Sequence, residues 1–518
     1  MQKNKIPLLP ILLIGSLFFL TSCLVNPVTG KRELGVVTQD QEIAIGTEQY
    51  GSTQQIQGGT YSVDLALERY VQRVGHRIAE VSGVDLPYEF VVVNNSTPNA
   101  WALPGGKIAV NRGLLMELRS EAELAAVLAH EIAHSAARHG ARRIERGMLL
   151  QGGLLAASIA SKKSEYGRLV VGGAQLGSQL IQQKYSREAE FEADQYGMQF
   201  MSNAGYDPGA AVDLQKTFVR LSNNREKTWL SGLFSTHPPS QERVKRNQKK
   251  LDSMQITAQI GNITGVQQYQ DAISYIDQKK PAYEKYAKAR QAFTNGHLLE
   301  AEETINEAIK IEDEDSIFHT LRGDIRFERG EFAASVSDYD RAIQLSDHFA
   351  SFLGRGLARI RLKETLPAKT DFLKSVGLLP TSEALYELGK ISEQDGEFDV
   401  ALDYYRNAAS SESVSGREAT RAAVRIDLAR NPDDFVSVRV EGIAPNIVVG
   451  ITNLTAFDMS NVVVAVDVIQ SNLKKNQYRI DLLRLDRNTT AFRTLAADSG
   501  IFVQNVTMKV ESAQLQRM

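Results

Sequence analysis

The sequence predicts a multi-domain protein with three folded parts: a mainly helical α+β domain, an α-solenoid and a small C-terminal β-sandwich. Three observations predict this fold class. Apolar residues recur at helical spacing through the first half, small residues recur about every 34 positions in the middle, and apolar and polar residues alternate along the last part. A chain of 518 residues is long enough for about three domains.

The chain begins with the layout of a secretory signal peptide. Lys3 and Lys5 precede an apolar run that is too short for a membrane span of ~20 residues. The run ends in Leu-Thr-Ser-Cys23, which resembles a bacterial lipobox. This resemblance implies cleavage before Cys23 and lipidation of its thiol, and Leu24 then favours the outer membrane. The alternative is an ordinary signal peptide with an incidental cysteine. Cys23 is the only cysteine, so an internal disulfide is excluded.

The strongest chemical signal is His130-Glu131-Ile-Ala-His134. On a helix of about 3.6 residues per turn, His130 and His134 share one face and can hold one metal ion, which is the H-E-x-x-H zinc pattern. Glu131 can hold a water against the metal and take its proton. A chance pattern on an ordinary helix is the alternative. The context favours the metal, because a capping box at Ser120–Glu123 and apolar residues at helical spacing predict a buried helix.

A catalytic zinc usually has three protein ligands and leaves one position for water. His139 does not fit the metzincin spacing, so we expect it to support the site or the fold rather than bind the metal. A carboxylate from a later helix is the other source. Glu188, Glu190 and Glu192 lie close together at helical spacing, and spacing alone leaves the choice between them open.

Several separated motifs resemble the HtpX/CAAX-prenyl-protease family of zinc metallopeptidases. They are a Pro-Gly-Gly hairpin before the zinc motif, H-E-I-A-H itself, S-R-x-x-E-x-E-A-D around Glu190, and T-H-P-P around His237. The resemblance runs from about Pro27 through Arg243. It implies a zincin-type domain with Glu190 as third ligand and Asp194 orienting a zinc histidine. It also places His237 near the metal, where it either supports the transition state or blocks the position of the water.

Integral-membrane members of that family carry spanning helices, and this chain shows none. The apolar stretches 148–160 and 169–177 are interrupted by charged residues, so we expect a lid or a packed helix there. The chain therefore resembles the soluble periplasmic branch, which includes the β-barrel assembly-enhancing proteases. The hairpin at 99–110 offers a strand edge that could pair with an extended peptide, or it only covers the core.

The middle of the chain repeats at intervals of 34, 34 and 32 residues, and this period resembles tetratricopeptide repeats. Three sets of equivalent positions carry the pattern. They are the turn positions Gly296, Gly330, Glu364 and Gly396; the earlier positions Ala289, Gly323, Leu357 and Gly389; and the later positions Ala308, Ala342, Val376 and Ala408. Stacked helix pairs form a concave surface suited to a polypeptide partner. A scaffold that only stabilises the protease is the alternative.

From Phe435 onward the period changes to two. Alternating runs at 436–440, 462–468 and 506–510, separated by turn-like segments, predict a small antiparallel β-sandwich. We expect an accessory binding or docking module, because no chemical motif is visible in it.

The zinc motif and the resemblance together predict a zinc-dependent endopeptidase, with His130, His134 and Glu190 on Zn²⁺ and Glu131 as general base. The resemblance implies that it acts in the bacterial cell envelope, lipid-anchored on the periplasmic side of the outer membrane, with misfolded or unassembled envelope proteins as its substrates. The alternative is a chaperone or outer-membrane assembly factor with a latent protease site. The net charge of -3 gives no reason to expect a nucleic-acid partner. The expected parts are the signal peptide 1–22, lipidated tether 23–38, metallopeptidase domain 39–255, linker 256–280, repeat domain 281–430 and β-sandwich 431–518.

Overall fold

The computed structural model describes most of the chain. The described residues are 23–150, 181–182, 184–222, 235–254, 262–441, 446–469, 475–496 and 506–516. They form two compact units, divided between Pro380 and Thr381. The signal peptide and most of the expected lid lie outside the described residues. Within the described residues, no helix combines the length and the apolar character needed to cross a membrane.

The first unit contains a three-stranded sheet in the order β3-β5-β4. β3 (Glu89–Val93) runs parallel to β5 (Lys107–Asn111), and β4 (Ala100–Leu103) pairs with β5 in the antiparallel sense. β4 and β5 are the predicted hairpin. Its turn contains Gly105 and Gly106 with φ of 76° and 86°, a region that side chains other than glycine rarely adopt.

Helix α5 (Glu121–Ala136) carries the H-E-x-x-H motif and is buried along nearly its whole length. The side chain of Ser120 accepts a hydrogen bond from the Glu123 amide at 3.1 Å, as a helix cap does. The predicted capping box is not complete, however. The Glu123 carboxylate accepts from the Arg119 amide at 2.6 Å, one residue before the cap, instead of from the amide of Ser120.

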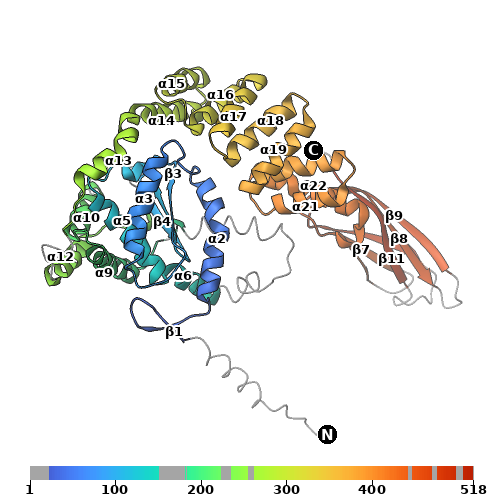
Figure 1. Cartoon of the computed structure of the whole chain (residues 1–518). Helices are drawn as coiled ribbons and strands as arrows, with labels where there is room; N and C mark the ends of the chain where they lie inside the picture. Colours follow the sequence, from blue (N-terminus) through green and yellow to red (C-terminus); the bar gives the residue numbers. More distant parts are fainter. Residues whose placement is uncertain are drawn as a thin grey trace, which may run out of the picture. The chain divides into compact units, whose positions relative to one another are not determined.

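Further helices surround the sheet and α5 (Figure 1). They are α2 (Gln39–Ile56), α3 (Leu65–Ala79), α4 (Arg112–Leu115), α6 (His139–Leu150), α9 (Arg187–Asn203), α10 (Gly209–Ser222), α12 (Gln241–Ser253) and α13 (Val266–Gln278). Helix α5 packs against α3, α9 and α10, and α12 packs against α9 and α10. Helices α9, α10 and α12 therefore place side chains beside the zinc motif. Helix α13 lies within the segment expected to be a linker and packs against α3 and α5.

The residues that follow Cys23 form a short hairpin of β1 (Cys23–Val25) and β2 (Arg32–Leu34). This hairpin is bonded to the end of α5 and to α6. The buried Asn26 amide donates to the Ala137 carbonyl at the end of α5, at 2.9 Å, and Arg142 pairs with Glu33 at 3.0 Å. The segment expected to be a tether is thus largely folded onto the domain.

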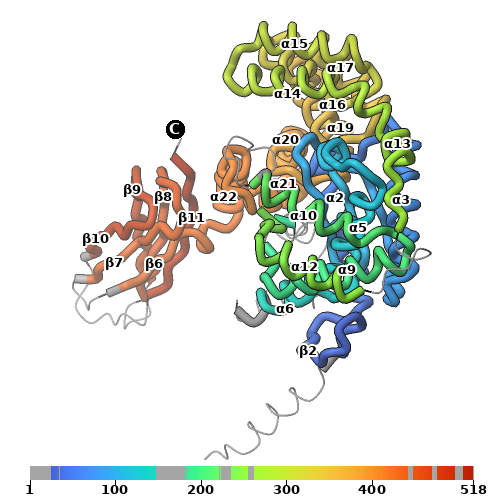
Figure 2. The backbone as a smooth tube through the Cα atoms, turned by 90° about the vertical axis from the view of Figure 1, so that its left-hand side faces the viewer, coloured from blue at the N-terminus to red at the C-terminus, as the bar shows by residue number. Residues whose placement is uncertain are grey.

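The repeats form antiparallel helix pairs, and Figure 2 shows the first of them stacked at the top of the first unit. The pairs of this unit are α14 (Lys280–Thr294) with α15 (Leu298–Ile311), α16 (Ser316–Glu328) with α17 (Phe332–Leu345), and α18 (Phe349–Arg361) with α19 (Thr365–Leu378). The turn glycines Gly296 and Gly330 have φ of 78° and 79°. The prediction of an α-solenoid is confirmed.

The register predicted for the third repeat is wrong by one residue. The positive φ of 65° lies at Lys363, not at Glu364, which is the N-cap of α19. Gly356, not Leu357, meets the ring of Phe372, where an added Cβ would come within 2.6 Å. Ser375, not Val376, is the fully buried small residue. The spacing is therefore 33 residues at this point, and the missing turn glycine concealed it.

The second unit begins with α20 (Ser382–Gln394) paired with α21 (Phe398–Ala408), followed by α22 (Val414–Arg430). Two antiparallel three-stranded sheets follow, ordered β10-β7-β6 and β11-β8-β9. Their strands are β6 (Val436–Glu441), β7 (Asn446–Asn453), β8 (Met459–Ile469), β9 (Lys475–Leu485), β10 (Thr490–Ala496) and β11 (Val506–Leu515). Both sheets contribute valines and isoleucines to one buried core, as the predicted β-sandwich requires.

Candidate metal centre

Four side chains converge beside the sheet of the first unit: His130, His134, Glu190 and His237. One ligand atom from each lies within 4.8 Å of every other. The two Nε2 atoms of His130 and His134 are 3.0 Å apart, and Glu190 Oε1 lies 3.4 Å from His134 Nε2 and 3.0 Å from His237 Nδ1. The two histidines of α5 thus meet a carboxylate of α9 and a histidine that precedes α12.

These distances fit a tetrahedral zinc. Ligand atoms at 2.0–2.1 Å from zinc lie roughly 3.3 Å from one another. Three imidazole nitrogens turned toward one shared point are unfavourable neighbours without a cation or shared protons between them. The donor set of imidazole and carboxylate is one that zinc accepts. We therefore conclude that the residues present fit a zinc ion.

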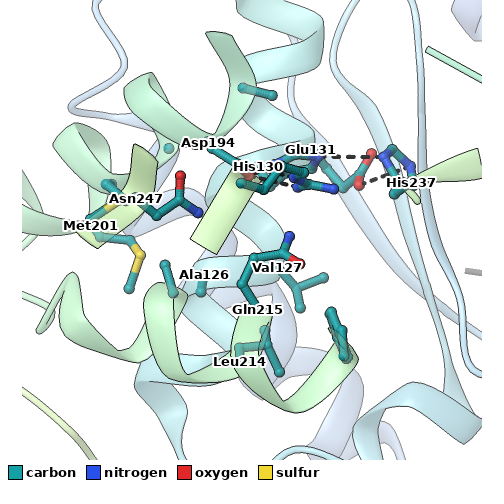
Figure 3. A pocket seen from close by; sticks show the side chains of 16 residues that line it. Ala126, Val127, His130, Glu131, Asp194, Met201, Leu214, Gln215, His237 and Asn247 are labelled. Carbon is teal, nitrogen blue, oxygen red and sulfur yellow. Dashed lines mark hydrogen bonds and ion pairs between the residues drawn. The ribbon is translucent and has the colours of Figure 1, made fainter. Parts of the chain in front are cut away.

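Glu131 lies beside this cluster on α5. It is 2% exposed, and its Oε1 is 3.6 Å from Nε2 of His237. Its other oxygen, Oε2, is buried and has no hydrogen-bond partner among the described residues. A buried carboxylate oxygen without a partner is costly in a purely structural role. Glu131 is thus placed to hold a water or a substrate group, and Figure 3 shows it facing His237.

Behind the cluster, Asp194 and Arg243 hold His130 and Glu190 in place. Asp194 Oδ1 lies 3.1 Å from Nδ1 of His130, which turns Nε2 of that ring toward the cluster. Arg243 pairs with both acids, through Nη1 to Glu190 Oε2 at 2.7 Å and through Nη2 to Asp194 Oδ1 at 2.6 Å. All three groups are buried. Arg243 therefore fixes the relative position of Glu190 and Asp194.

On the other side, His134 is held by two neighbours. His139 places its Nδ1 2.7 Å from Nδ1 of His134, and its Nε2 lies 3.2 Å from Glu192. The ring of Tyr185 stacks on His134 with centroids 3.9 Å apart. His139 is thus outside the four-residue cluster and contacts it from behind.

Burial and charge set the protonation of the cluster. Burial alone would raise the pKa of the Glu190 carboxyl, but His237 and Arg243 outweigh it and hold that pKa well below its usual range. Burial likewise opposes charge on His130, yet its bonds to Asp194 and Glu190 raise the pKa of His130 to about 10. For His134, burial dominates and lowers the pKa. Without a metal, Glu190 is thus ionised, His134 neutral and His130 protonated, and a metal ion that binds at the cluster displaces the proton from His130.

The structure brings together every residue that the sequence analysis assigned to the site, apart from Cys23, whose side chain lies outside the described residues. Among the three candidate carboxylates, Glu190 points into the cluster, Glu192 pairs with His139, and Glu188 is exposed. The roles of these residues remain predictions. Sequence reasoning missed Arg243 and Tyr185. Arg243 lies six positions after His237, but nothing in the spacing shows which acids it would pair with.

Comparison with known proteins agrees with this geometry. The model of peptidase family M48 matches residues 65–250, and a tetratricopeptide-repeat model matches residues 286–348. The mitochondrial metalloendopeptidase OMA1 of Schizosaccharomyces pombe is 33% identical over 246 residues, which cover 47% of this chain and 70% of that protein. The chain belongs to peptidase family M48. The predictions of a metallopeptidase and of tetratricopeptide repeats are thereby confirmed.

Other M48 relatives match a smaller share of their own length. The β-barrel assembly-enhancing protease of Yersinia pestis is 29% identical over 44% of this chain and 47% of that protein. The protein of the same name from Escherichia coli K12 is 28% identical over 37% of this chain and 40% of that protein. The chain thus spans less than half the length of these two relatives. Membership in a metallopeptidase family implies a metal at the cluster.

Proposed function

We propose that this protein is a zinc-dependent endopeptidase of the bacterial cell envelope. The observation that carries this proposal is the convergence of His130, His134, Glu190 and His237 at zinc-like distances beside the buried Glu131. His130, His134 and Glu190 would be the permanent ligands. Zinc, when bound, lowers the pKa of a coordinated water and polarises the substrate carbonyl.

The remaining chemistry falls to the side chains of this chain. Glu131 accepts a proton from the attacking water at its carboxylate and delivers it to the nitrogen of the leaving amine. Asp194 accepts the Nδ1 proton of His130 and so fixes the tautomer that leaves Nε2 free to bind. Arg243 keeps the carboxylates of Glu190 and Asp194 ionised and in position. Together these contacts hold the reacting groups without rearrangement.

His237 supports a second candidate function, a protease that is gated. Its Nδ1 lies 3.0 Å from Glu190 Oε1 and 3.4 Å from Nε2 of His130, which is the fourth corner of the cluster. A histidine in that corner takes the place of the attacking water. In this arrangement the protein binds clients through its repeats and cleaves only after His237 moves away. The displaced His237 can then support the transition state.

We propose misfolded or unassembled envelope proteins as the clients, held by the repeats. An open cleft of about 1240 Å³ supports this role, because the repeat helices supply much of its lining. Tyr286, Arg290 and Phe293 of α14 line this cleft together with Asn95, which offers aromatic, cationic and amide groups to a polypeptide. A lipid on Cys23 would anchor the protein at the periplasmic face of the outer membrane, close to the assembly machinery of that membrane.

Metal analysis of purified variants tests the ligand assignment. Glu190→Gln should lose stoichiometric zinc, because a neutral amide is a poor ligand and no longer offers a charge to His237. Glu188→Gln is the matched control, since Glu188 is exposed on the same helix. The control should keep one zinc per chain. Full zinc content in Glu190→Gln would refute the proposed site.

Digestion of casein or an unfolded porin tests the activity. Zinc-loaded wild type should cleave these proteins, and a chelator should stop the cleavage. If only His237→Ala cleaves, the gated function describes the resting protein. If neither protein cleaves with zinc bound, the proposed activity is wrong.

A further inference from the structure

A row of hydrogen-bonded side chains connects the zinc motif to the N-terminal hairpin. Nδ1 of His134 lies 2.7 Å from Nδ1 of His139, and Nε2 of His139 lies 3.2 Å from Oε2 of Glu192. Arg142 donates to the same oxygen of Glu192 and to Glu33 of β2, at 3.0 Å in both cases. Side chains from α5, α6, α9 and β2 thus follow one another. We call them the supporting row.

We propose that the supporting row positions His134 for the metal, and that the N-terminal hairpin is therefore part of the metal centre. Glu192 and His139 select the tautomer of His134 that binds zinc. Glu33 holds Glu192 in place through Arg142. These four are positioning residues, because none of them belongs to the four-residue cluster. This inference rests on the zinc site of the proposed function and adds how that site is supported.

The two imidazoles of the row allow one arrangement with zinc on His134. Nε2 of His134 faces the cluster, 3.4 Å from Oε1 of Glu190, so the lone pair of Nε2 is the one available to a metal. The proton of that ring then lies on Nδ1 and is donated to Nδ1 of His139. His139 must carry its own proton on Nε2, which faces the carboxylate of Glu192. Every nitrogen of the pair then has a partner of the matching kind.

The carboxylate of Glu192 opposes the reverse arrangement. If His139 donated from Nδ1 instead, its Nε2 would turn a lone pair toward a negative oxygen 3.2 Å away. His134 would then carry its proton on Nε2, at the position of the metal. Both rings are at most 2% exposed, so little water can reach them to replace a missing donor. The charge of Glu192 thus acts on the metal site through two imidazole rings.

The carboxylate of Glu192 needs support, because its side chain is 19% exposed. Arg142 and Lys31 contact its two different oxygens, at 3.0 and 3.3 Å, and so fix its orientation. Arg142 is held in turn by Glu33 and by the carbonyl of Ala137, the latter at 3.1 Å. Lys31 and Glu33 both belong to the N-terminal hairpin. The hairpin therefore supplies two of the charges that orient Glu192.

A buried asparagine holds the hairpin in this place. Asn26 is 1% exposed, and its amide donates to the Ala137 carbonyl at 2.9 Å and to Glu33 at 3.3 Å. Ala137 is the C-cap of α5, so its carbonyl has no partner within that helix. Figure 2 shows the hairpin at the lower end of the first unit, below α6 and α9. The hairpin thus binds the end of the zinc helix and orders Glu33 at the same time.

The zinc affinity of purified variants, measured by competition with a fluorescent chelator, tests the role of Glu192. Glu192→Gln should weaken zinc binding by about 10–100-fold, because an amide can donate as well as accept and no longer selects the tautomer. Glu188→Gln, exposed one turn earlier on the same helix, is the matched control and should keep the wild-type affinity. Wild-type affinity in Glu192→Gln would overturn the inference.

Variants of His139 separate positioning from a role in folding. His139→Leu removes the acceptor of the His134 proton and should weaken zinc binding by a similar factor. The side-chain oxygen of His139→Asn can accept that proton without help from Glu192, so this variant should recover most of the affinity. Adding Glu192→Gln to His139→Asn should then cause no further loss. Losses that add in the double variant are those of independent sites and would contradict the supporting row.

Glu33→Gln tests the hairpin. It should weaken zinc binding by about two- to fivefold, because the pair of Glu33 with Arg142 is partly exposed. Combined with Glu192→Gln it should cause no further loss, since Glu33 acts through Glu192. Arg32→Gln, exposed at the preceding position of β2, is the control. An unchanged affinity in Glu33→Gln, or the same loss with and without Glu192, would refute the role of the hairpin.

Nuclear magnetic resonance of protein labelled with ¹⁵N-histidine tests the tautomers in the wild type itself. In the zinc-loaded protein, His134 should carry its proton on Nδ1 and His139 on Nε2. The signals that disappear in His139→Asn belong to His139. A proton on Nδ1 of His139 would overturn the inference.

These outcomes distinguish the supporting row from the proposed function. A wild type that binds zinc and cleaves, together with row variants of unchanged zinc affinity, would refute the supporting row alone. A wild type that binds no zinc would refute the proposed site, and this inference with it.

Discussion

Two buried polar clusters of the first unit are built from similar groups but differ in what they leave unpaired. The metal centre combines Arg243 with the carboxylates of Glu190 and Asp194. The second cluster lies between the sheet and the repeat helices and combines Arg112 with Asp315. We call it the junction cluster, and it comprises the buried residues Asn94, Arg112, Tyr283 and Asp315, with the exposed Ser96 at its edge.

The polar groups of the junction cluster form hydrogen bonds with one another. The guanidinium of Arg112 lies 3.4 Å from the ring centroid of Tyr283 and donates to Asn94 at 3.1 Å and Ser96 at 2.7 Å. Asp315 accepts from the Tyr283 hydroxyl at 2.9 Å and from the Asn94 amide at 2.8 Å. The metal centre instead leaves one oxygen of Glu131 without a partner and turns several nitrogens toward one point.

This difference separates a structural cluster from a functional one. Buried charges that pair completely contribute to holding two parts of a fold together. Several imidazole nitrogens and a carboxylate turned toward one point, beside a carboxylate oxygen without a partner, are costly in a purely structural role and indicate a site that binds a ligand or a metal. The two clusters have similar residue types, but they differ in whether their buried polar groups have hydrogen-bond partners.

The largest expected effect is at the metal centre. Glu131→Gln removes the general base but keeps the shape of the side chain, so kcat/KM for a peptide should fall by about 10²–10⁴-fold. Zinc content and the unfolding midpoint should stay as in the wild type. Glu123→Gln, in the first turn of the same helix, is the control and should retain activity. A Glu131→Gln protein with wild-type kcat/KM would show that another group carries the proton.

Substitutions in the junction cluster should change the stability of the protein rather than its catalytic activity. Arg112→Leu removes the cation that favours the charged form of the buried Asp315 and leaves the side-chain oxygen of Asn94 without its donor, so it should lower the free energy of unfolding by roughly 1–3 kcal/mol. The loss is measured by urea denaturation, with zinc content unchanged below the transition. Arg112→Lys keeps the charge but loses the planar contact with Tyr283, so its loss should be smaller. Lower kcat/KM at unchanged stability would place Arg112 in the active site and break the comparison.

A third buried cluster, formed by Glu42, Arg138 and Glu145, should make the stability of the protein depend on pH. Burial raises the pKa of Glu42 from 4.5 to about 7, although Arg138 opposes the shift and Glu145 adds to it. The folded protein therefore holds this proton more tightly than the unfolded chain does. The free energy of unfolding should fall as pH rises from about 4.5 to 7, by an amount on the order of 2 kcal/mol.

Glu42→Gln should remove this contribution, because the amide does not titrate. The measurement is the difference in urea midpoint between pH 4.5 and 7.5 for the variant and the wild type. Glu48→Gln, at an exposed site on the same helix, should keep the wild-type dependence. An unchanged pH dependence in Glu42→Gln would show that Arg138 fully compensates the carboxylate.

The smallest expected effect lies outside all three clusters. Lys363 has φ of 65° at the turn of the third repeat, where the other repeats have glycine. Lys363→Gly should raise the free energy of unfolding by about 0.5–1 kcal/mol, because it relieves the left-handed strain at a helix end. The reverse change, Gly330→Lys, should lower it. A lower unfolding midpoint for Lys363→Gly would mean that the lysine side chain makes a compensating contact.

The sequence predicted those features that depend on local spacing. The two histidines of α5, the hairpin before it and the helix pairs of the repeats follow from periods of 3.6, 2 and about 34 residues. The choice of Glu190 came from family resemblance, because three acids share its helix and spacing does not say which one faces the histidines. The register of the third repeat was missed because its turn has Lys363 at the position where the other repeats have glycine.

Contacts between distant segments were not predictable in this way. Arg243 reaches Glu190 and Asp194 only because α12 packs against α9. Arg112 meets Tyr283 only because the repeat helices cover the end of the sheet. Strands β7, β9 and β10 were also missed. In β9, more buried and more exposed side chains alternate, but the many charged residues on the exposed side leave only a short apolar pattern in the sequence.

The hairpin that begins at Cys23 has a consequence for where such an enzyme could work. Cys23 is the first residue of β1, and Asn26, three positions later, is bonded to the end of α5. An acyl chain on that cysteine would be attached directly to the folded protease domain and not through a long flexible linker. The distance of the active site from the membrane would then be limited by the size of the domain, so only polypeptides close to the bilayer would reach it.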